Sequence, residues 1–317
     1  MAARANSFAS RFVEGLRYRG REGQLAYFGQ RLAGLGTLLF LAIHIVDTSS
    51  VYFGQLLGLP DLYAHAIDIY RLPIFMLGEI VLVAALFYHG INGLRIILHD
   101  TFPHWWNKGF ERQSFYKVAA LTLLMWLPAA FLMARSLYIH SLCASCAAEA
   151  AAAAAPTVAE IAARTNLAIT LVPIAFIVIL GVLAVGGTLS APPAPRRAAV
   201  VRRTFDTYVW QFMRWSGLLL IPLAWIHVVI QDVLIGVHAI NLDFVALRLA
   251  TVGWRLYDIA LLGFAFGHGM LGLRNIVNDY VTHPGWNRAL HWGLLIGWIV
   301  ITAIGAVAVL GGVQQPA

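Results

Sequence analysis

Charge is scarce in this sequence of 317 residues: only 12% of them are Asp, Glu, Lys or Arg, whereas 60% are hydrophobic. Soluble domains usually carry about twice that share of charge, so a soluble globular fold is excluded. Apolar stretches of about 20 residues recur along the chain, and each is long enough to cross a bilayer as a helix. The sequence therefore predicts an all-α, polytopic transmembrane helix bundle. The net charge of +7 then reflects basic loops held against an anionic membrane surface rather than nucleic-acid binding.

Cysteine is nearly absent, since the chain has only Cys143 and Cys146, in a CxxC. Iron–sulfur clusters take sets of cysteine ligands, and dinucleotide sites use a glycine fingerprint that the chain lacks. Neither cofactor is therefore expected here, and the two cysteines are interpreted as a local disulfide or an idle pair. The start of the chain has no apolar core, so no cleavable signal peptide is expected. Residues 1–30 are predicted to lie as a basic segment on the inner surface.

Seven spans account for the apolar stretches, and most Lys and Arg residues gather at alternate ends of them. Because the basic loops of membrane proteins face the cytoplasm, we expect a cytoplasmic N-terminus and an outer C-terminus, in a bacterial cytoplasmic membrane. The expected spans are residues 31–53, 73–98, 117–139, 167–188, 211–236, 253–277 and 290–312.

Two motifs occur twice in the same order. The stretches FYHGINGLRIILHD (87–100) and FGHGMLGLRNIVND (266–279) are identical at eight of fourteen positions and share HxxxGLRxxxxD. Likewise, RLAGLGTLLFLAIH (31–44) is echoed by RWSGLLLIPLAWIH (214–227), with Arg thirteen and Gly ten residues before His. The chain is therefore expected to contain two copies of a three-span unit.

A three-span unit begins inside and ends outside, so a second copy in the same orientation needs one extra crossing. The fourth span supplies it, flanked by low-complexity linkers of the kind that join formerly separate subunits. The Ala-rich part of the first linker predicts a short helix. The expected domains are a basic N-terminal segment (1–30), a first three-span unit (31–140), a linker with the extra span (141–210) and a second three-span unit (211–317).

Four histidines lie deep within predicted spans, at equivalent sites of the two units: His44, His89, His227 and His268. Ionisable residues in the apolar region are costly and tend to be functional. Neutral imidazoles bonded to neighbouring helices are the structural alternative, which explains one histidine better than four at repeated sites. Catalytic zinc would need carboxylates beside clustered histidines, and a proton pump would need a chain of buried carboxylates. Haem iron held between two histidines fits the pattern best.

Depth along the spans predicts two tiers of histidines. His44 and His227 lie about 20 Å beyond an inner-edge arginine, at thirteen residues. His89 and His268 lie about 16 Å before an inner-edge aspartate, at eleven residues. We therefore expect His89 to pair with His268 nearer the inside. His44 then pairs with His227 nearer the outside, which favours two haems stacked across the bilayer.

Arginines near the inner edge are candidates for binding haem propionates. Arg95 and Arg274 stand six residues beyond a histidine, about 9 Å closer to the inner surface, where a guanidinium reaches propionates or lipid phosphates. Arg31 and Arg214 open the first span of each unit and are expected to contact propionates as well. A plain positive-inside anchor is the alternative for Arg95 and Arg274.

These motifs resemble the cytochrome b membrane anchor of succinate dehydrogenase and fumarate reductase, complex II. The first unit is similar to the C subunit through RLAGLGTLLFLAIHIVDTSSVYFG and HGINGLR, and the second to the D subunit through WQFMRWSGLLLIPLAWIHVV and HGMLGLRNIVNDYV. The resemblance covers nearly all of residues 25–290 and implies a C–D fusion. It implies haem b between the units and a quinone near the inner surface. It also implies a flavoprotein subunit with FAD and an iron–sulfur subunit as partners, which perform the succinate and fumarate chemistry, so no catalytic residue is expected here.

The resemblance also implies a quinone site. The D subunit's Asp–Tyr pair corresponds to Asp279 and Tyr280, and the quinone-site arginine of the C subunit corresponds to Arg31. Tyr27 stands where the family often has serine, and Ser216 of the second unit is a further candidate. A phenol at Tyr280 can donate a hydrogen bond to a quinone carbonyl, and a tyrosine of the aromatic belt is the alternative. Two haem tiers favour menaquinone, as menaquinone-linked members of the family are thought to need them.

Two other function classes stay open at this point. A haem b anchor of another quinone-linked dehydrogenase would also use membrane histidines, but it should lack the duplicated GLR…D motif. A transporter built from parallel repeats, with histidines that gate protons, would contain no haem. Bound haem therefore separates a cytochrome from a transporter.

Overall fold

The computed structural model of the protein describes residues 20–152, 155–190 and 203–313. Helices are the only regular secondary structure in these residues, and seven of them are long and apolar enough to cross a membrane, which confirms the predicted fold class. The long helices are α2 (Arg21–Leu56), α4 (Pro73–Thr101), α5 (Lys108–Leu137), α7 (Val158–Ser190), α8 (Phe205–Val228), α10 (Val252–Tyr280) and α11 (Pro284–Gly311).

Several of the long helices extend well beyond the apolar stretches that predicted them. Helix α2 begins at Arg21, so the expected boundary at residue 30 falls inside this helix, and residues 1–19 lie outside the described chain. Hydropathy finds only the bilayer-length part of a helix, whereas the helix itself continues until a stop signal such as proline. The expected boundary at residue 210 falls inside α8 for the same reason.

Local signals in the sequence set where the helices start. Pro73 and Pro284 occupy the first turns of α4 and α11, where the missing N–H has no partner to lose. The Asn107 side chain caps α5 by accepting a hydrogen bond from the Phe110 backbone N–H at 2.9 Å. Thr204 caps α8 with a reciprocal capping box.

Short helices cover one end of the bundle. They are α3 (Leu62–Tyr70), η4 (Val237–Ala239) and α9 (Leu242–Leu249), and the motif analysis missed them because each is far shorter than a span. Helix α8 continues as a π-helical segment, η3 (Val229–Ile235), and stops at Gly236. The φ angle of Gly236 is +81°, a conformation that favours glycine.

The Ala-rich linker forms helix α6 (Ala144–Ala152), as predicted. It follows η2 (Tyr138–Leu142), a π-helical extension of α5. Cys143 and Cys146 form a disulfide beside it, which confirms the interpretation as a local disulfide over an idle pair.

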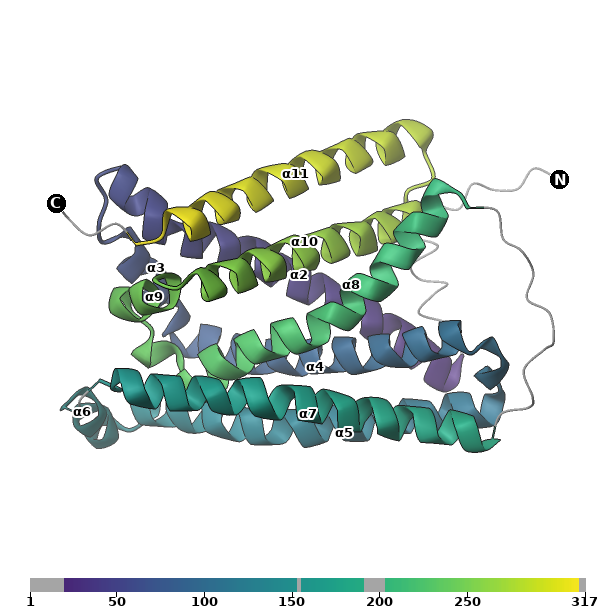
Figure 1. Ribbon diagram of the computed structural model, residues 1–317, viewed down its shortest axis with the longest axis horizontal. Helices are drawn as coiled ribbons and strands as arrows, with labels where there is room; N and C mark the ends of the chain where they lie inside the picture. Colours follow the sequence, from purple (N-terminus) through teal and green to yellow (C-terminus); the bar gives the residue numbers. More distant parts are fainter. Residues whose placement is uncertain (1–19, 153–154, 191–202, 314–317) are drawn as a thin grey trace.

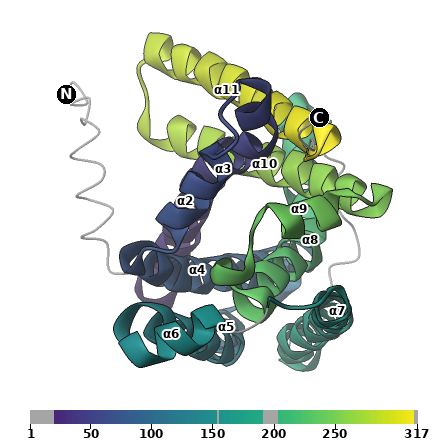
Figure 2. The ribbon, with the colours of Figure 1, turned by 90° about the vertical axis from the view of Figure 1, so that its left-hand side faces the viewer.

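Four helices form the centre of the molecule, because α2 packs against α4 and α10, and α8 packs against the same two helices. Helix α5 covers α4, α7 lies against α5 and α8, and α11 covers α2 and α10 (Figures 1 and 2). The first unit is therefore α2, α4 and α5, and the second is α8, α10 and α11. We call the end where α2 and α8 begin, and α4 and α10 finish, the basic end; α3 and α9 lie at the opposite, far end (Figure 1).

Candidate functional site

A cavity of about 610 Å³ runs through the centre of the four-helix core. Its walls are mostly apolar, and all four span histidines line it. Arg31 and Arg214 contribute to the lining near the basic end, and Arg248 of α9 contributes at the far end. A largely apolar cavity with a few convergent polar groups is the usual form of a cofactor site.

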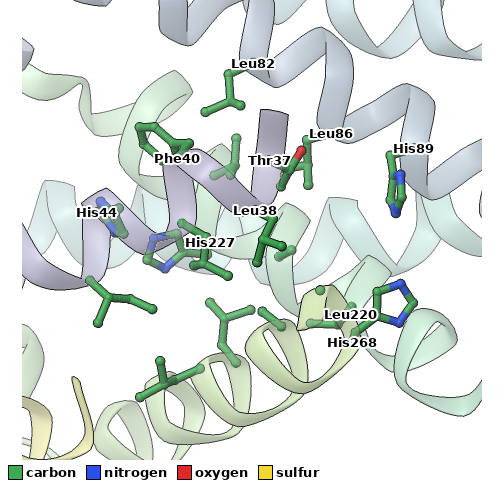
Figure 3. A pocket seen from close by; sticks show the side chains of 18 of the residues that line it. Thr37, Leu38, Phe40, His44, Leu82, Leu86, His89, Leu220, His227 and His268 are labelled. Carbon is green, nitrogen blue, oxygen red and sulfur yellow. The ribbon is translucent and has the colours of Figure 1, made fainter. Parts of the chain in front are cut away.

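The histidines meet in two pairs across this cavity (Figure 3). The ring centres of His89 and His268 are 6.2 Å apart, with the rings at 90°, and we call these two the basic-end pair. His44 and His227 are 6.1 Å apart at 82°, and we call them the far pair. The expected proximity of each pair is thus observed; their role as iron ligands stays a prediction. Leu38 lies between the two pairs in Figure 3.

The spacing of each pair fits a metal ion held between two imidazoles. A metal–nitrogen bond is about 2 Å long, and the nitrogen is about 1 Å from the ring centre, so two opposed rings lie about 6 Å apart. No three His, Cys, Asp or Glu side chains of the described residues are grouped to hold a metal ion by themselves. Two ligands per site, with the other positions filled by a macrocycle, is the arrangement that haem iron takes.

Helices α2 and α8 hold the imidazoles of the basic-end pair. His89 Nδ1 lies 3.1 Å from the Gln30 backbone oxygen, and His268 Nδ1 lies 3.0 Å from Ser216 Oγ. Because the Ser216 hydroxyl donates to the Phe212 carbonyl at 2.6 Å, its oxygen accepts from His268. Each ring therefore presents its other nitrogen, Nε2, as a ligand, and the hydrogen bond raises the basicity of that ligand.

The glycines of the two RxxG motifs make room for these rings. A Cβ on Gly34 would lie 2.8 Å from His89 Cε1, and a Cβ on Gly217 would lie 3.2 Å from His268 Cε1. A side chain at Gly34 would therefore clash with the His89 ring, and one at Gly217 would press more lightly on the His268 ring. Gly34 precedes His44 by ten residues, so the two pairs are separated by about 15 Å along α2. That separation leaves room for two metal positions rather than one.

The far pair has different neighbours. The His44 ring stacks on Phe40 at 5.4 Å and faces the Tyr70 ring edge-on at 6.5 Å. The Tyr70 hydroxyl donates to Asp47 Oδ2 at 3.0 Å, and burial together with this carboxylate raises the pKa of Tyr70 well above its ordinary value. His227 Nδ1 is buried with no hydrogen-bond partner among the described residues.

Arg248 is a cavity residue that the sequence motifs did not identify. Its guanidinium pairs with Asp258 at 2.6 Å, and both side chains are largely buried. It also lies over the Trp254 ring at 4.3 Å. Arg248 brings a cation to the far end of the cavity. No motif signals it, because α9 lies outside the repeated spans.

Two ion pairs cross between the units at the basic end. Arg31 of the first unit pairs with Asp279 of the second, and Arg214 of the second pairs with Asp100 of the first. Each arginine comes from an RxxG motif, and each aspartate closes the HxxxGLRxxxxD motif of the other unit. The two repeated motifs therefore meet in space as reciprocal partners.

The residues predicted for quinone binding gather around Arg31, with one exception. The Arg31 guanidinium lies 4.2 Å from the Tyr27 ring centre and 6.0 Å from that of Tyr280, beside its ion pair with Asp279. Ser216 is separate from this group: it is buried and bonded to His268. We call Arg31, Tyr27, Asp279 and Tyr280 the Arg31 cluster.

Arg95 and Arg274, the other two arginines predicted for propionates, lie outside the cavity lining. Arg95 is 4% exposed and donates hydrogen bonds toward α5, to Ser114 Oγ at 2.8 Å and to the Glu111 carbonyl at 3.4 Å. Arg274 pairs with Asp206, at the start of α8, at 3.2 Å. The propionate role of these two arginines therefore stays a prediction.

Fold and site together define a class of protein: a duplicated membrane anchor whose two halves enclose paired histidines. The sequence profile of the succinate dehydrogenase/fumarate reductase transmembrane subunit family matches this chain twice, at residues 16–131 and 188–309. The chain therefore belongs to that family and is a membrane subunit of complex II. The double match supports the predicted fusion of two subunits and leaves most of α7 outside both copies.

One curated relative matches a part of the chain that is about as long as one three-span unit. The succinate dehydrogenase 2 membrane subunit SdhC of Mycobacterium tuberculosis is 29% identical over 125 residues. That match spans 39% of this chain and 85% of the relative. The difference between the two fractions is what a fusion of two anchor subunits predicts.

Proposed function

We propose that this chain is the haem b-containing anchor of a succinate:quinone oxidoreductase and passes electrons between the iron–sulfur subunit and a membrane quinone. Family membership supports the anchor role and argues against an anchor of another dehydrogenase or a haem-free transporter. The observation that carries the haem proposal is the pair of imidazole spacings, 6.2 and 6.1 Å, within one cavity.

Two haems b would be held, one by the basic-end pair and one by the far pair. When bound, haem b would supply a redox centre within the apolar interior that accepts and releases one electron. The Gln30 carbonyl and the Ser216 hydroxyl orient the basic-end ligands and fix their tautomers. The far ligands are positioned by packing on Phe40 and Tyr70 instead.

The arginines that line the cavity are the best candidates for propionates. Arg31 and Arg214 lie near the basic-end pair, and Arg248 lies at the level of the far pair. A guanidinium suits a carboxylate because it donates two parallel hydrogen bonds. Arg95 and Arg274 are weaker candidates, since neither side chain lines the cavity.

The Arg31 cluster is the proposed quinone site. Reduction of a quinone to a quinol takes two electrons and two protons. Arg31 and the Tyr280 hydroxyl can donate hydrogen bonds to a quinone carbonyl and hold it at the basic end. Asp279 has 47% of its side chain exposed and can exchange protons with water. The two histidine tiers favour menaquinone as the substrate.

The basic end is proposed to face the cytoplasm of a bacterial cell, with the C-terminus on the other side of the cytoplasmic membrane. Its excess of Lys and Arg supports this orientation. The flavoprotein subunit, with FAD, and the iron–sulfur subunit would dock at this end, next to the Arg31 cluster. Residues 31–140 then act as a C-like unit and residues 211–317 as a D-like unit.

Haem b per chain in the purified complex tests this function. The measurement is a pyridine haemochrome assay on wild type and on His89→Ala, His44→Ala and His65→Ala. His65 is an exposed histidine of α3 and serves as the matched control. We expect two haems in wild type and in the control, and the loss of one in each of the other variants. A wild-type complex without haem would refute the proposal, and one haem, lost only in His89→Ala, would restrict it to the basic-end pair.

A further inference from the structure

A buried polar network lies behind His89, on the side away from the cavity. Asn92, Arg95 and Ser114 are 0%, 4% and 1% exposed. Arg95 donates to Asn92 Oδ1 at 3.2 Å and to Ser114 Oγ at 2.8 Å, and Ser114 donates to the Glu111 carbonyl at 2.9 Å. The network therefore ties α4 to α5 through one guanidinium.

Gln30 connects this network to His89. The Asn92 amide donates to Gln30 Oε1 at 2.9 Å, and Gln30 Nε2 donates to the His89 backbone oxygen at 3.2 Å. The Gln30 backbone oxygen also accepts from His89 Nδ1. Gln30 thus holds both the backbone and the ring of His89, and Asn92 and Arg95 hold Gln30. Such fully bonded buried networks fix a single side-chain arrangement.

The second unit has the same helices without this network. Asn92 corresponds to Leu271 in the repeat, and Gln30 corresponds to Met213. Arg274, the counterpart of Arg95, reaches the surface and pairs with Asp206. The helix arrangement of the unit therefore forms without a buried arginine, so packing alone does not explain Arg95.

The charge of Arg95 is placed to act on the basic-end pair. Arginine stays protonated in proteins, and burying it without a carboxylate partner is costly. Arg95 forms no ion pair with any described residue; Glu111 is the carboxylate that acts on it. It stands six residues from His89 along α4, about 9 Å. A positive charge at that distance favours the reduced, less positive state of an iron between His89 and His268.

We propose that Arg95 is a positioning residue for the basic-end haem: through Asn92 and Gln30 it fixes His89, and its buried charge makes that haem easier to reduce. This inference rests on the proposed function. The step affected is the transfer of one electron from the reduced iron–sulfur subunit of the proposed complex to the ferric iron. The two haems then differ because one unit carries the network and the other does not.

The test is a redox titration of both haems in the whole complex, with wild type, Arg95→Gln, Arg95→Lys and Asn92→Leu. Arg95→Gln should shift the reduction equilibrium of one haem about tenfold toward the ferric state, or about 59 mV for one electron. Arg95→Lys keeps the charge and should restore most of the shift. Asn92→Leu copies the second unit and should change the ferric EPR signal of the same haem. Arg112→Gln, at an exposed arginine of α5 that pairs with Glu22, is the control and should change neither haem.

The outcomes separate this inference from the proposed function. A wild-type complex without haem would defeat both. Normal haem content with both potentials and both EPR signals unchanged in Arg95→Gln and Asn92→Leu would overturn the inference alone. Should Arg95→Gln fail to assemble, Ser114→Ala and Asn92→Leu decide, because each loosens the network and keeps the charge. An unchanged EPR signal in those two variants would then overturn it.

Discussion

His89 of the first unit and His268 of the second occupy equivalent places, yet their rings are held in different ways. The first is bonded to a backbone carbonyl and backed by a buried network, and the second is bonded to the hydroxyl of Ser216. Position 216 is serine in the second unit, and its counterpart in the first is Ala33. Duplication has therefore kept the helices and the histidines while the groups that orient them diverged.

The surroundings of the two histidines in the far pair differ more strongly between the two units. His44 lies beside Tyr70 and Asp47, whereas Arg248 lies on the side of His227. One half of the far site is thus acidic and phenolic, and the other half carries a buried cation. Two copies of one unit have become two unlike walls of a single cavity. Four measurements test how far the two units differ.

The largest expected effect comes from the glycines that face the rings. Gly34→Val should remove the haem at the basic-end pair, because even a Cβ there would lie 2.8 Å from His89 Cε1. Gly217→Ala should be milder, since the corresponding distance is 3.2 Å. Gly36→Val is the control, because nothing lies within 4 Å of a Cβ at that position. The haem content per chain is measured for all three variants. Equal losses of haem in Gly34→Val and Gly36→Val would contradict the geometry.

The next effect tests whether the quinone binds at the Arg31 cluster or beside the Arg214–Asp100 pair. Tyr280→Phe should lower quinone reductase activity about tenfold, because it removes one hydrogen-bond donor from the substrate. Its matched control is Thr101→Val, at the equivalent position after Asp100. Activity is measured with succinate and a soluble quinone at unchanged haem content. A loss in Thr101→Val alone would move the quinone site to the Arg214 side.

A smaller effect concerns the crossed ion pairs. Asp100 is 24% exposed and Asp279 is 47% exposed, so solvent screens the second pair more strongly. Asp100→Asn should destabilise the complex by up to about 1 kcal/mol and Asp279→Asn by less. Thermal inactivation of the detergent-solubilised complex measures the difference. The reverse order would mean that exposure does not govern these pairs.

The smallest effect tests a third imidazole pair, at the far end. His140 and His238 stack with ring centres 3.8 Å apart, too close to hold a metal between them. Burial, with His140 and Arg71 nearby, lowers the pKa of His238 to about 4. The unfolded chain binds a proton near pH 6.5, so this group costs stability as the pH falls from about 6.5 toward 4.

His238→Gln should therefore make the stability of the complex less dependent on pH within that window. Thermal inactivation between pH 7 and pH 4 compares the variant with wild type. His65→Gln, at an exposed histidine, is the control and should leave the profile unchanged. An identical slope in wild type and His238→Gln would show that the stacked pair stays neutral for another reason.

Much of this architecture could be predicted from repeats and apolar length alone. The number of spans, the duplicated unit and the proximity of each histidine pair follow from HxxxGLRxxxxD, RxxG and the rise of a helix. The network behind His89 could not be predicted, because it depends on which way Arg95 turns once α5 packs against α4. Arg248 was missed because a short helix outside the spans carries it, and no repeat marks it.

Ser216 shows a further limit of motif reasoning. It was a further candidate for the quinone site, in the second unit, and it lies two residues beyond Arg214. Two residues along a helix turn a side chain by about 200°, so Ser216 and Arg214 face different neighbours. Its hydroxyl is bonded to His268 and to the Phe212 carbonyl. Ser216 does lie close to Arg214 along the chain. The direction in which its side chain leaves the helix, however, decides which groups it contacts.

The crossed pairs Arg31–Asp279 and Arg214–Asp100 have a consequence for how the molecule is assembled. Each half carries one cation and one anion whose partners belong to the other half. As an independent protein, each half would leave this cation and this anion without their partners. Two separate chains would therefore have to associate before these charges were paired. Joining them turns that encounter into an intramolecular event with a high effective concentration. The fusion thereby guarantees one copy of each half in every anchor, whatever the level of expression.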